Sequence, residues 1–381
     1  MGLFGLPASA QPLYPTPDPD PFYAAPSDLA SLQPGDVVRL RRVGTGPYVG
    51  SEGWQVAFRS TNSTGNPVMG VTTVLRPMGV PNPPLVSYQA LINSLGTKCQ
   101  PSRSLLNGGM PEEDMVAGAM APIARGWAVS MPDYLGPTSA YGAAKLSGMM
   151  TLDSIKAVKK TADLGLAASP VAIAGYSGGA MATAWAAALQ PTYAPDLRLT
   201  AAVAGGIPAD LEEMATALGF EPHPGFGLAF AAAMGLEREY PDRLPVSEQL
   251  NENGLWFREL THDACRKFLL FHGAFRSAEQ MAASKNLMDS PEAHAVLREN
   301  SLRYFEGVPG IPTYFWQARF DELTHFGPVA ELADRYCKAG TPLQFRPYDI
   351  TEHMTAAITG FGGAWNYLEA RFRGEPAPTS C

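Results

Sequence analysis

The sequence predicts an α/β fold, in which a mostly parallel central sheet is flanked by helices and carries an inserted helical cap. Short apolar runs alternate with helix-like segments along most of the chain, which is typical of a parallel sheet. A Gly-x-Ser-x-Gly motif, Gly175 to Gly179, stands between one such run and an Ala-rich helical segment. Helical patterns predominate from residue 207 to 310. We therefore expect an N-terminal segment over 1–34, a core over 35–206 and 311–381, and a cap over 207–310.

The composition is that of a folded chain without affinity for polyanions. The 381 residues are 46% hydrophobic and 17% charged, with a formal net charge of -8, unlike the composition of disordered chains. No dense run of Lys or Arg is present, so we do not expect nucleic acid or anionic membranes as partners. The apolar stretch from Phe226 to Leu236 has about half of the roughly 20 residues that cross a bilayer. No transmembrane segment is predicted, and the composition does not indicate an oligomeric state.

The N-terminus and the cysteines both point to an oxidising compartment. Residues Gly2 to Ala10 are apolar and end in Ala-Ser-Ala, as the end of a secretory signal sequence does, so we expect a secreted protein. The Pro- and Asp-rich residues 11–34 predict an extended arm. An even number of cysteines suits two disulfides, and the absence of a Cys-x-x-Cys pair argues against a zinc site. The four cysteines are Cys99, Cys265, Cys337 and Cys381.

The elements of the core follow from the periodicity of apolar residues. Two alternating runs between Trp54 and Arg76, separated by a turn-rich segment, predict a β-hairpin. Further strands are predicted over residues 84–90, 126–131, 171–174, 199–204, 311–317 and 342–348. Helices are predicted over residues 112–125, 156–166, 179–190 and 355–372.

The context of Gly175 to Gly179 predicts a catalytic serine. In a nucleophile elbow the serine occupies a strained turn between a strand and a helix, and small residues two positions away let the backbone and the helix approach each other. Ser177 follows the strand predicted over 171–174 and precedes the Ala-rich helix. Motif and context therefore agree, whereas an ordinary strand-to-helix turn would not require these glycines.

A serine hydroxyl needs a base and an acid that orients the base, and this type of site supplies them in the order serine, acid, histidine. His353 lies a few residues after the last predicted strand, and Asp321 directly after the one before it, so both should lie on loops at the same sheet edge. His325 is the alternative base, but it has no acid before it in the expected place. Glu322 is the alternative acid. Asp349 is too close to His353 in sequence to reach the far ring nitrogen.

The remaining histidines fall in the expected cap, where structural or surface roles are more common. They are His223, His262, His272 and His294.

The negative charge that develops during acyl transfer requires backbone N–H donors. The residue after the nucleophile, Gly178, supplies the first. We expect the second in the loop after the strand over 84–90, where Asn93 is the best candidate.

Four short motifs give the chain a family resemblance: Gly175 to Ala180 (GYSGGA), Pro132 to Pro137 (PDYLGP), Asp20 to Tyr23 (DPFY) and Cys99 to Ser102 (CQPS). Together they resemble the secretory lipase family of fungal lipase A-type and actinobacterial enzymes. The resemblance implies an α/β-hydrolase core with a helical cap, hydrolysis of triacylglycerols or simpler esters, and no cofactor.

Carried over residue by residue, the resemblance implies a triad of Ser177, Asp321 and His353, with Gly178 in the oxyanion hole. It also implies a disulfide between Cys99 and Cys265 that ties the core to the cap, which leaves Cys337 for Cys381. The family commonly has Asp-Ser where this chain has Asn93-Ser94.

Two alternatives to an ester hydrolase of lipid-like substrates remain open at this point. A protein of the same fold could act on peptides or polyesters, or could be a catalytically silent binding protein. The apolar segment Phe226 to Met234 could line an acyl-chain tunnel, or it could be a buried cap helix. No metal site is predicted.

Overall fold

The computed structural model describes residues 11–105, 113–284, 289–349 and 352–381. Nine strands form one mixed sheet in the order β1-β2-β3-β5-β4-β6-β7-β8-β9. The pairs from β5 through β9 are parallel, and the pairs β1·β2, β2·β3 and β3·β5 are antiparallel. The predicted α/β-hydrolase fold class, with its mostly parallel sheet, is thereby confirmed. The strands are β1 (Val37–Val43), β2 (Ser51–Thr61), β3 (Pro67–Pro77), β4 (Leu85–Gln89), β5 (Ala128–Pro132), β6 (Val171–Tyr176), β7 (Ala201–Gly205), β8 (Thr313–Ala318) and β9 (Leu343–Tyr348).

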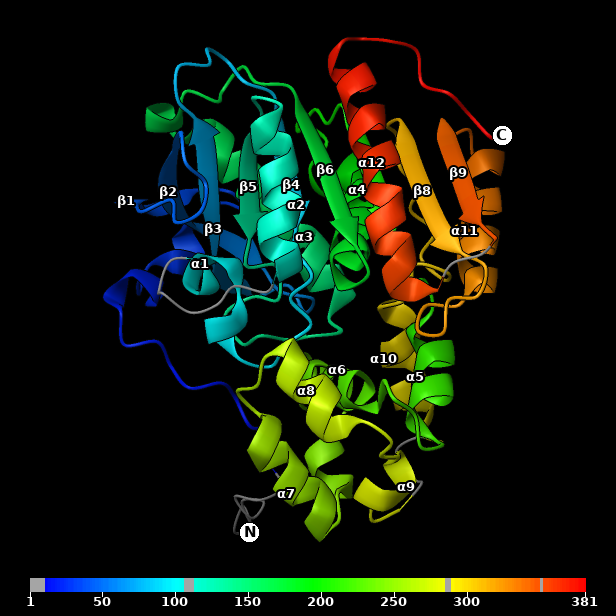
Figure 1. The fold of residues 1–381 in the computed structure, drawn as a ribbon. Helices are drawn as coiled ribbons and strands as arrows, with labels where there is room; N and C mark the ends of the chain where they lie inside the picture. The colour runs from blue at the N-terminus through cyan, green and yellow to red at the C-terminus, as the bar shows by residue number, and fades with distance from the viewer. Residues whose placement is uncertain (1–10, 106–112, 285–288, 350–351) are drawn as a thin grey trace.

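Helices cover both faces of the sheet (Figure 1). Side chains of α2 and α12 pack with one face, and those of α3, α4 and α11 with the other, so the central strands are buried on both sides. This explains why their sequences are continuous apolar runs. The helices of the core are α1 (Pro101–Ser104), α2 (Glu113–Ala124), α3 (Ala144–Lys160), α4 (Gly178–Tyr193), α11 (Phe326–Lys338) and α12 (His353–Phe372).

The described residues between β7 and β8 contribute no strand to the sheet. They form six α-helices that lie together at the end of the sheet toward which the parallel strands point (Figure 1). Ligands of open α/β sheets bind at this carboxyl end. The six helices are α5 (Leu211–Gly219), α6 (Phe226–Glu239), α7 (Glu252–Thr261), α8 (Arg266–Gly273), α9 (Ala278–Met281) and α10 (Pro291–Glu299).

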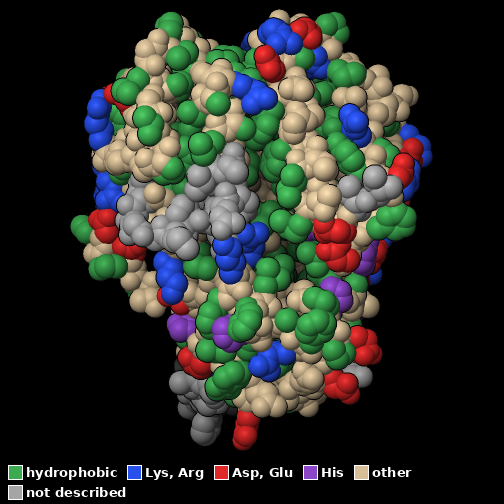
Figure 2. Space-filling model, in the orientation of Figure 1, with side chains coloured by type: hydrophobic (Ala, Val, Ile, Leu, Met, Phe, Trp, Pro, Cys, Tyr) green, Lys and Arg blue, Asp and Glu red, His purple; other side chains and the backbone are tan. Residues whose placement is uncertain are grey.

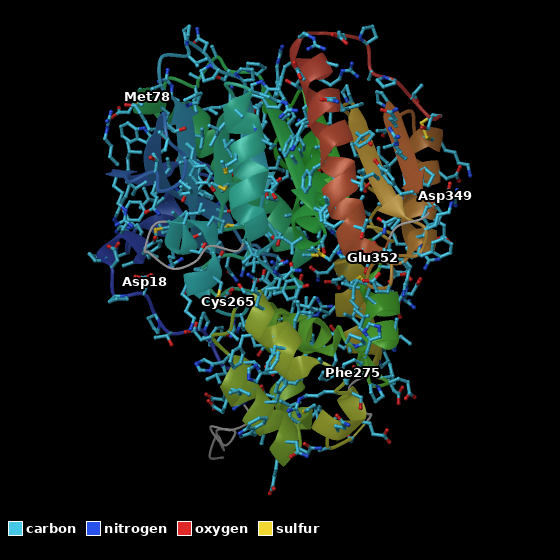
Figure 3. The ribbon with its side chains drawn as sticks, viewed as in Figure 1. Asp18, Met78, Cys265, Phe275, Asp349 and Glu352 are labelled. Carbon is cyan, nitrogen blue, oxygen red and sulfur yellow. A yellow bond between two sulfur atoms is a disulfide. The ribbon has the colours of Figure 1, made fainter. Side chains whose placement is uncertain are left out.

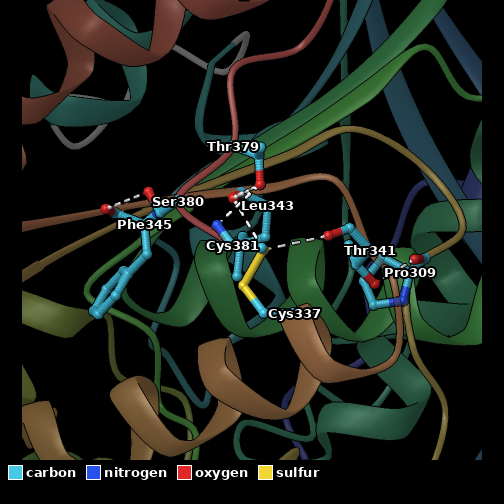
Figure 4. The surroundings of a disulfide bond; sticks show 8 residues. All are labelled: Pro309, Cys337, Thr341, Leu343, Phe345, Thr379, Ser380 and Cys381. Atoms are coloured by element: carbon cyan, nitrogen blue, oxygen red, sulfur yellow. Dashed lines mark hydrogen bonds between the residues drawn. A yellow bond between two sulfur atoms is a disulfide. The ribbon is translucent and has the colours of Figure 1, made fainter.

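Two disulfides are present, as predicted. Cys99 is joined to Cys265, which connects the segment after β4 to the start of α8. Cys337 on α11 is joined to Cys381 (Figure 4). The tail before Cys381 pairs with edge strand β9, because the Ser380 N–H donates to the Leu343 carbonyl at 2.8 Å. The tail thus covers a sheet edge that would otherwise present unpaired backbone groups.

The elements predicted from periodicity are present, with one clear error. The helix predicted over 156–166 is α3, which begins at Ala144 and ends at Lys160. Its first three turns lack an amphipathic pattern because they are buried almost all round, and Gly148 lies against Trp185 and Ala186 of α4. Strand β1 and helix α11 were not predicted. The predicted signal-sequence remnant lies outside the described residues, and no helix among the described residues is long and apolar enough to span a bilayer.

Candidate active site

Ser177 lies in a sharp turn between β6 and α4. Its φ of 54° falls in the left-handed region, which is strained for a residue with a side chain. The Ser177 N–H donates to the Gly205 carbonyl of β7 at 2.8 Å, and this bond holds the turn against the sheet. The residue is 7% exposed, so its hydroxyl lies in a nearly closed environment.

The glycines on either side of Ser177 are required by close backbone approach. A Cβ at Gly175 would lie 2.3 Å from the Gly179 carbonyl oxygen, and a Cβ at Gly179 would lie 2.0 Å from the Gln89 carbonyl oxygen. No larger residue fits at either position without moving β4 or α4. Close backbone contacts therefore explain why the motif has glycine at both positions, as predicted.

His353 begins α12 and is 1% exposed. Its Nε2 lies 2.9 Å from Ser177 Oγ, and its Nδ1 lies 2.8 Å from Asp321 Oδ2. Two hydrogen bonds hold the backbone of His353. The Tyr176 hydroxyl donates to its carbonyl, and its N–H donates to Glu322 Oε2 at 3.2 Å. The three predicted residues thus form one row of hydrogen bonds.

Asp321 lies in the turn after β8 and is 6% exposed. Its Oδ1 accepts the backbone N–H groups of Leu323 at 3.0 Å and Thr324 at 2.7 Å. Its Oδ2 accepts from Gln317 Nε2 at 2.9 Å. These donors fix the plane of the carboxylate toward His353.

The sequence reasoning did not identify Gln317 or Tyr176 as parts of this site. Gln317 is a fully buried polar residue of β8, and its amide oxygen accepts the Ile207 N–H at 3.1 Å while its nitrogen reaches Asp321. A polar side chain inside an apolar strand was the available signal, because buried polar groups require partners. Tyr176, directly before the serine, carried no such signal.

Asn93 and Gly178 lie beside Ser177 and line the same cavity. Asn93 is 3% exposed with a φ of 42°. A Cβ at Gly178 would lie 1.9 Å from Asn93 Oδ1, so the two residues are in close contact. Within the described part of the chain, no acceptor is found for the backbone N–H of Asn93 or of Gly178. Both donors therefore remain available to a group bound at Ser177.

The alternative residues lie elsewhere. His325 Nδ1 contacts Glu213 Oε1 at 2.7 Å rather than the serine. Glu322 contacts the backbone of His353 and not its ring. Asp349 pairs with Arg319, and its side chain is 74% exposed (Figure 3). His294 binds Glu212 at 2.6 Å.

A cavity of about 330 Å³ leads from Ser177 into the helical segment. Most of its lining surface is apolar, although polar residues also contribute to it, among them Ser177, Asn93, Glu212 and His294. Such a cavity suits a fatty chain better than a charged or polar group. Its apolar lining includes Met181, Leu211, Met214, Phe226, Phe230 and Ala233.

Comparison with known proteins agrees with this geometry. Residues 111–380 match the family described as secretory lipase. Lipase A of Moesziomyces aphidis is 31% identical over 96% of this chain and 82% of the relative. A Mycobacterium tuberculosis protein named a probable inactive lipase is 30% identical over 94% of this chain and 83% of the relative.

The fold agrees equally well with a solved structure. Candida antarctica lipase A superposes with a TM-score of 0.86 at 29% identity, over 95% of this chain and 87% of that chain. The chain belongs to the secretory lipase family, and its predicted function as a lipase or carboxylesterase is confirmed at the level of that family.

Proposed function

We propose that this protein hydrolyses triacylglycerols or other lipid-like carboxylic esters through an acyl-enzyme on Ser177. The observation that carries the proposal is the row of hydrogen bonds from Ser177 through His353 to Asp321, set at the start of an apolar cavity. A serine, a base and an orienting acid in this arrangement perform acyl transfer on unrelated folds. The chemistry requires no cofactor.

The residues of the site have distinct roles in the proposed mechanism. Asp321 keeps the proton of His353 on Nδ1, so Nε2 accepts the proton of Ser177 as its oxygen attacks the ester carbonyl. The backbone N–H groups of Gly178 and Asn93 stabilise the oxyanion of the tetrahedral intermediate. His353 then returns the proton to the leaving alcohol, and it activates water for the second half of the reaction.

We propose residues 207–310 as a cap that binds the acyl chain. This assignment is supported by the cavity, whose apolar walls come largely from α5 and α6. A hydrocarbon chain buried there gains roughly 0.8 kcal/mol per methylene group. Long-chain esters should therefore bind more tightly than acetates.

The finer proposal is that the secreted protein works at an oil-water interface. Hydrophobic side chains are exposed on the helical segment (Figure 2). Phe271 of α8 is 80% exposed and Phe275, two residues beyond this helix, is 66% exposed (Figure 3). The formal net charge of -8 favours an uncharged lipid surface over an anionic one. Exchange of both phenylalanines for serine should lower activity on a triolein emulsion more than activity on dissolved p-nitrophenyl butyrate.

The decisive experiment compares the protein with its Ser177→Ala variant on p-nitrophenyl esters from acetate to palmitate. A matched control is Ser154→Ala, which removes a buried hydroxyl of α3 that donates to the Thr151 carbonyl of the same helix. We expect activity that rises with chain length, is lost in Ser177→Ala and is retained in Ser154→Ala. Equal activity in all three proteins, or none in the wild type, would contradict the proposal. The second outcome would favour a silent protein, a relevant alternative given the mycobacterial relative's name.

A further inference from the structure

Arg238, near the end of α6, is a buried cation that is held by backbone carbonyls. The residue is 5% exposed, and within the described part of the chain it forms no ion pair with a carboxylate. Burial lowers the pKa of the Arg238 guanidinium to about 10, so the group stays charged at neutral pH. Its donors reach the carbonyls of Leu13 at 2.9 Å, Leu95 at 2.7 Å, Thr138 at 2.8 Å, Ser139 at 3.2 Å and His262 at 2.6 Å.

These carbonyls come from four segments that are far apart in sequence. Leu13 belongs to the N-terminal arm, Leu95 to the loop after β4, and His262 to the end of α7. Thr138 and Ser139 lie in the loop after β5. A guanidinium has five N–H groups in a rigid planar fork, so one side chain can fix the relative positions of all four segments.

The loop after β4 is the one that carries Asn93, and both peptide groups from Ser94 to Gly96 are held by hydrogen bonds. Leu95 and Gly96 donate their N–H groups to the Ala264 carbonyl at 3.0 and 3.3 Å. The Ser94 carbonyl accepts from Ser139 Oγ at 3.1 Å. The Leu95 carbonyl accepts from Arg238.

The two loops joined by the bond from Ser139 to Ser94 each contain a residue with a strained backbone. Asn93 has a φ of 42° and Ser139 a φ of 49°, both in the left-handed region. Such conformations persist when surrounding contacts over-determine them. Arg238 provides contacts to both loops, directly at Leu95 and through Ser139 to Ser94.

We infer that Arg238 is a positioning residue of the cap, which holds the Asn93 backbone N–H where the oxyanion forms. The inference rests on the proposed role of Asn93 as the second oxyanion donor. It gives the cap a task in the chemical step in addition to binding the acyl chain. Mutation of Arg238 should then weaken stabilisation of the transition state without weakening binding of the acyl chain in the cavity.

Removal of the guanidinium should lower kcat rather than raise KM. Loss of one oxyanion donor costs about 10²- to 10³-fold in kcat, and a partial displacement costs less. For Arg238→Gln and Arg238→Lys we expect kcat to fall about 10- to 100-fold with KM changed by less than about threefold. Lysine keeps the charge but has one nitrogen, which cannot reach carbonyls on four segments.

The test measures kcat and KM for p-nitrophenyl decanoate, with Ki values for two inhibitors. An alkylboronic acid forms a tetrahedral adduct with the serine and reports on the oxyanion donors, whereas 1-decanol reports on the apolar cavity alone. In Arg238→Lys the boronate Ki should rise in parallel with the fall in kcat, and the decanol Ki should stay constant. The matched control is Arg258→Gln, since Arg258 is a buried arginine of α7 that donates to the same arm at the Gln11 carbonyl, 3.1 Å away.

A fall in kcat and boronate affinity in Arg238→Lys, but not in Arg258→Gln, supports the inference. An equal fall in both variants, or an unchanged kcat in Arg238→Lys, overturns it. If neither Arg238 variant folds, Ser139→Ala decides, because it removes only the hydroxyl bonded to the Ser94 carbonyl. A proportional loss of kcat and boronate affinity in Ser139→Ala supports the inference, and no loss overturns it. The proposed function is tested separately: activity that survives in Ser177→Ala would contradict that function and not the role of Arg238 alone.

Discussion

Replacement of Asp321 by asparagine tests how the acid acts on His353. The amide oxygen of the new side chain would take the Oδ1 position, because Leu323 and Thr324 donate their N–H groups there at 3.0 and 2.7 Å. The amide nitrogen then faces His353 Nδ1 and donates to it. That bond places the ring proton on Nε2, and His353 can no longer accept the proton of Ser177.

Gln317 cannot turn its own amide over to accommodate this change. Its nitrogen donates to Asp321 Oδ2 at 2.9 Å and to the Thr324 carbonyl at 2.6 Å, while its oxygen accepts the Ile207 N–H at 3.1 Å. In the Asp321→Asn variant the introduced amide nitrogen opposes the Gln317 nitrogen, so that two buried donors face each other. Such a loss costs about 1–3 kcal/mol of stability. The wrong tautomer should lower kcat by about 10⁴-fold.

The assay is steady-state hydrolysis of p-nitrophenyl decanoate at saturating substrate, with thermal unfolding followed by circular dichroism. Glu322→Gln is the matched control, because it removes the neighbouring charge while the new amide oxygen can still accept the backbone N–H of His353, as Glu322 does at 3.2 Å. We expect kcat of this control within about threefold of the wild type. A larger loss in Glu322→Gln than in Asp321→Asn would refute the assignment of the acid.

Three further predictions concern stability and chain-length preference. Burial raises the pKa of Asp133 to about 6 against the attraction of Arg103. The folded state therefore binds this proton more tightly than the unfolded state. The resulting stability, at most about 3 kcal/mol, is present below pH 4 and lost as pH rises through 6, so Asp133→Asn should flatten the dependence of Tm on pH between 4 and 7. Exchange of Cys99 and Cys265 for serine should cost about 2–5 kcal/mol of unfolding free energy in denaturant titrations. Ala233→Trp should fill the cavity, lowering kcat/KM for palmitate esters at least about tenfold relative to butyrate.

The hydrogen-bonded row of Ser177, His353 and Asp321 was predictable from the sequence because each member has a local signature. Ser177 stands in a motif whose glycines are demanded by backbone contacts of 2.3 and 2.0 Å. Asp321 follows β8, which is buried on both faces, and His353 follows the partly exposed edge strand β9. Position after a parallel strand therefore places a side chain at the carboxyl edge. The positions of these three residues relative to the predicted strands were therefore enough to predict that they lie close together.

The first half of α3 shows where periodicity fails. A helix buried against both sheet and helix has no polar face, so its sequence lacks the 3.6-residue alternation by which amphipathic helices are recognised. Residues 144–155 are mostly small or apolar, even the charged Asp153 is buried, and Gly148 allows close contact with Trp185. Only the end of α3, with Lys159 and Lys160, carries a recognisable pattern. The prediction therefore began too late along the chain.

The contacts that the end of α6 makes with distant segments could not be predicted, for a different physical reason. Glu237, Arg238 and Glu239 end an apolar helix, and such a charge run ordinarily favours a solvated helix end. In the structure all three are buried: Glu237 accepts from Ser247, Glu239 from Ser63, and Arg238 binds carbonyls of four segments. A carbonyl is present at every residue, so no side-chain pattern marks its partner. The sequence pattern places this charge run in water, but in the structure Arg238 binds the N-terminal arm and the loop that carries Asn93.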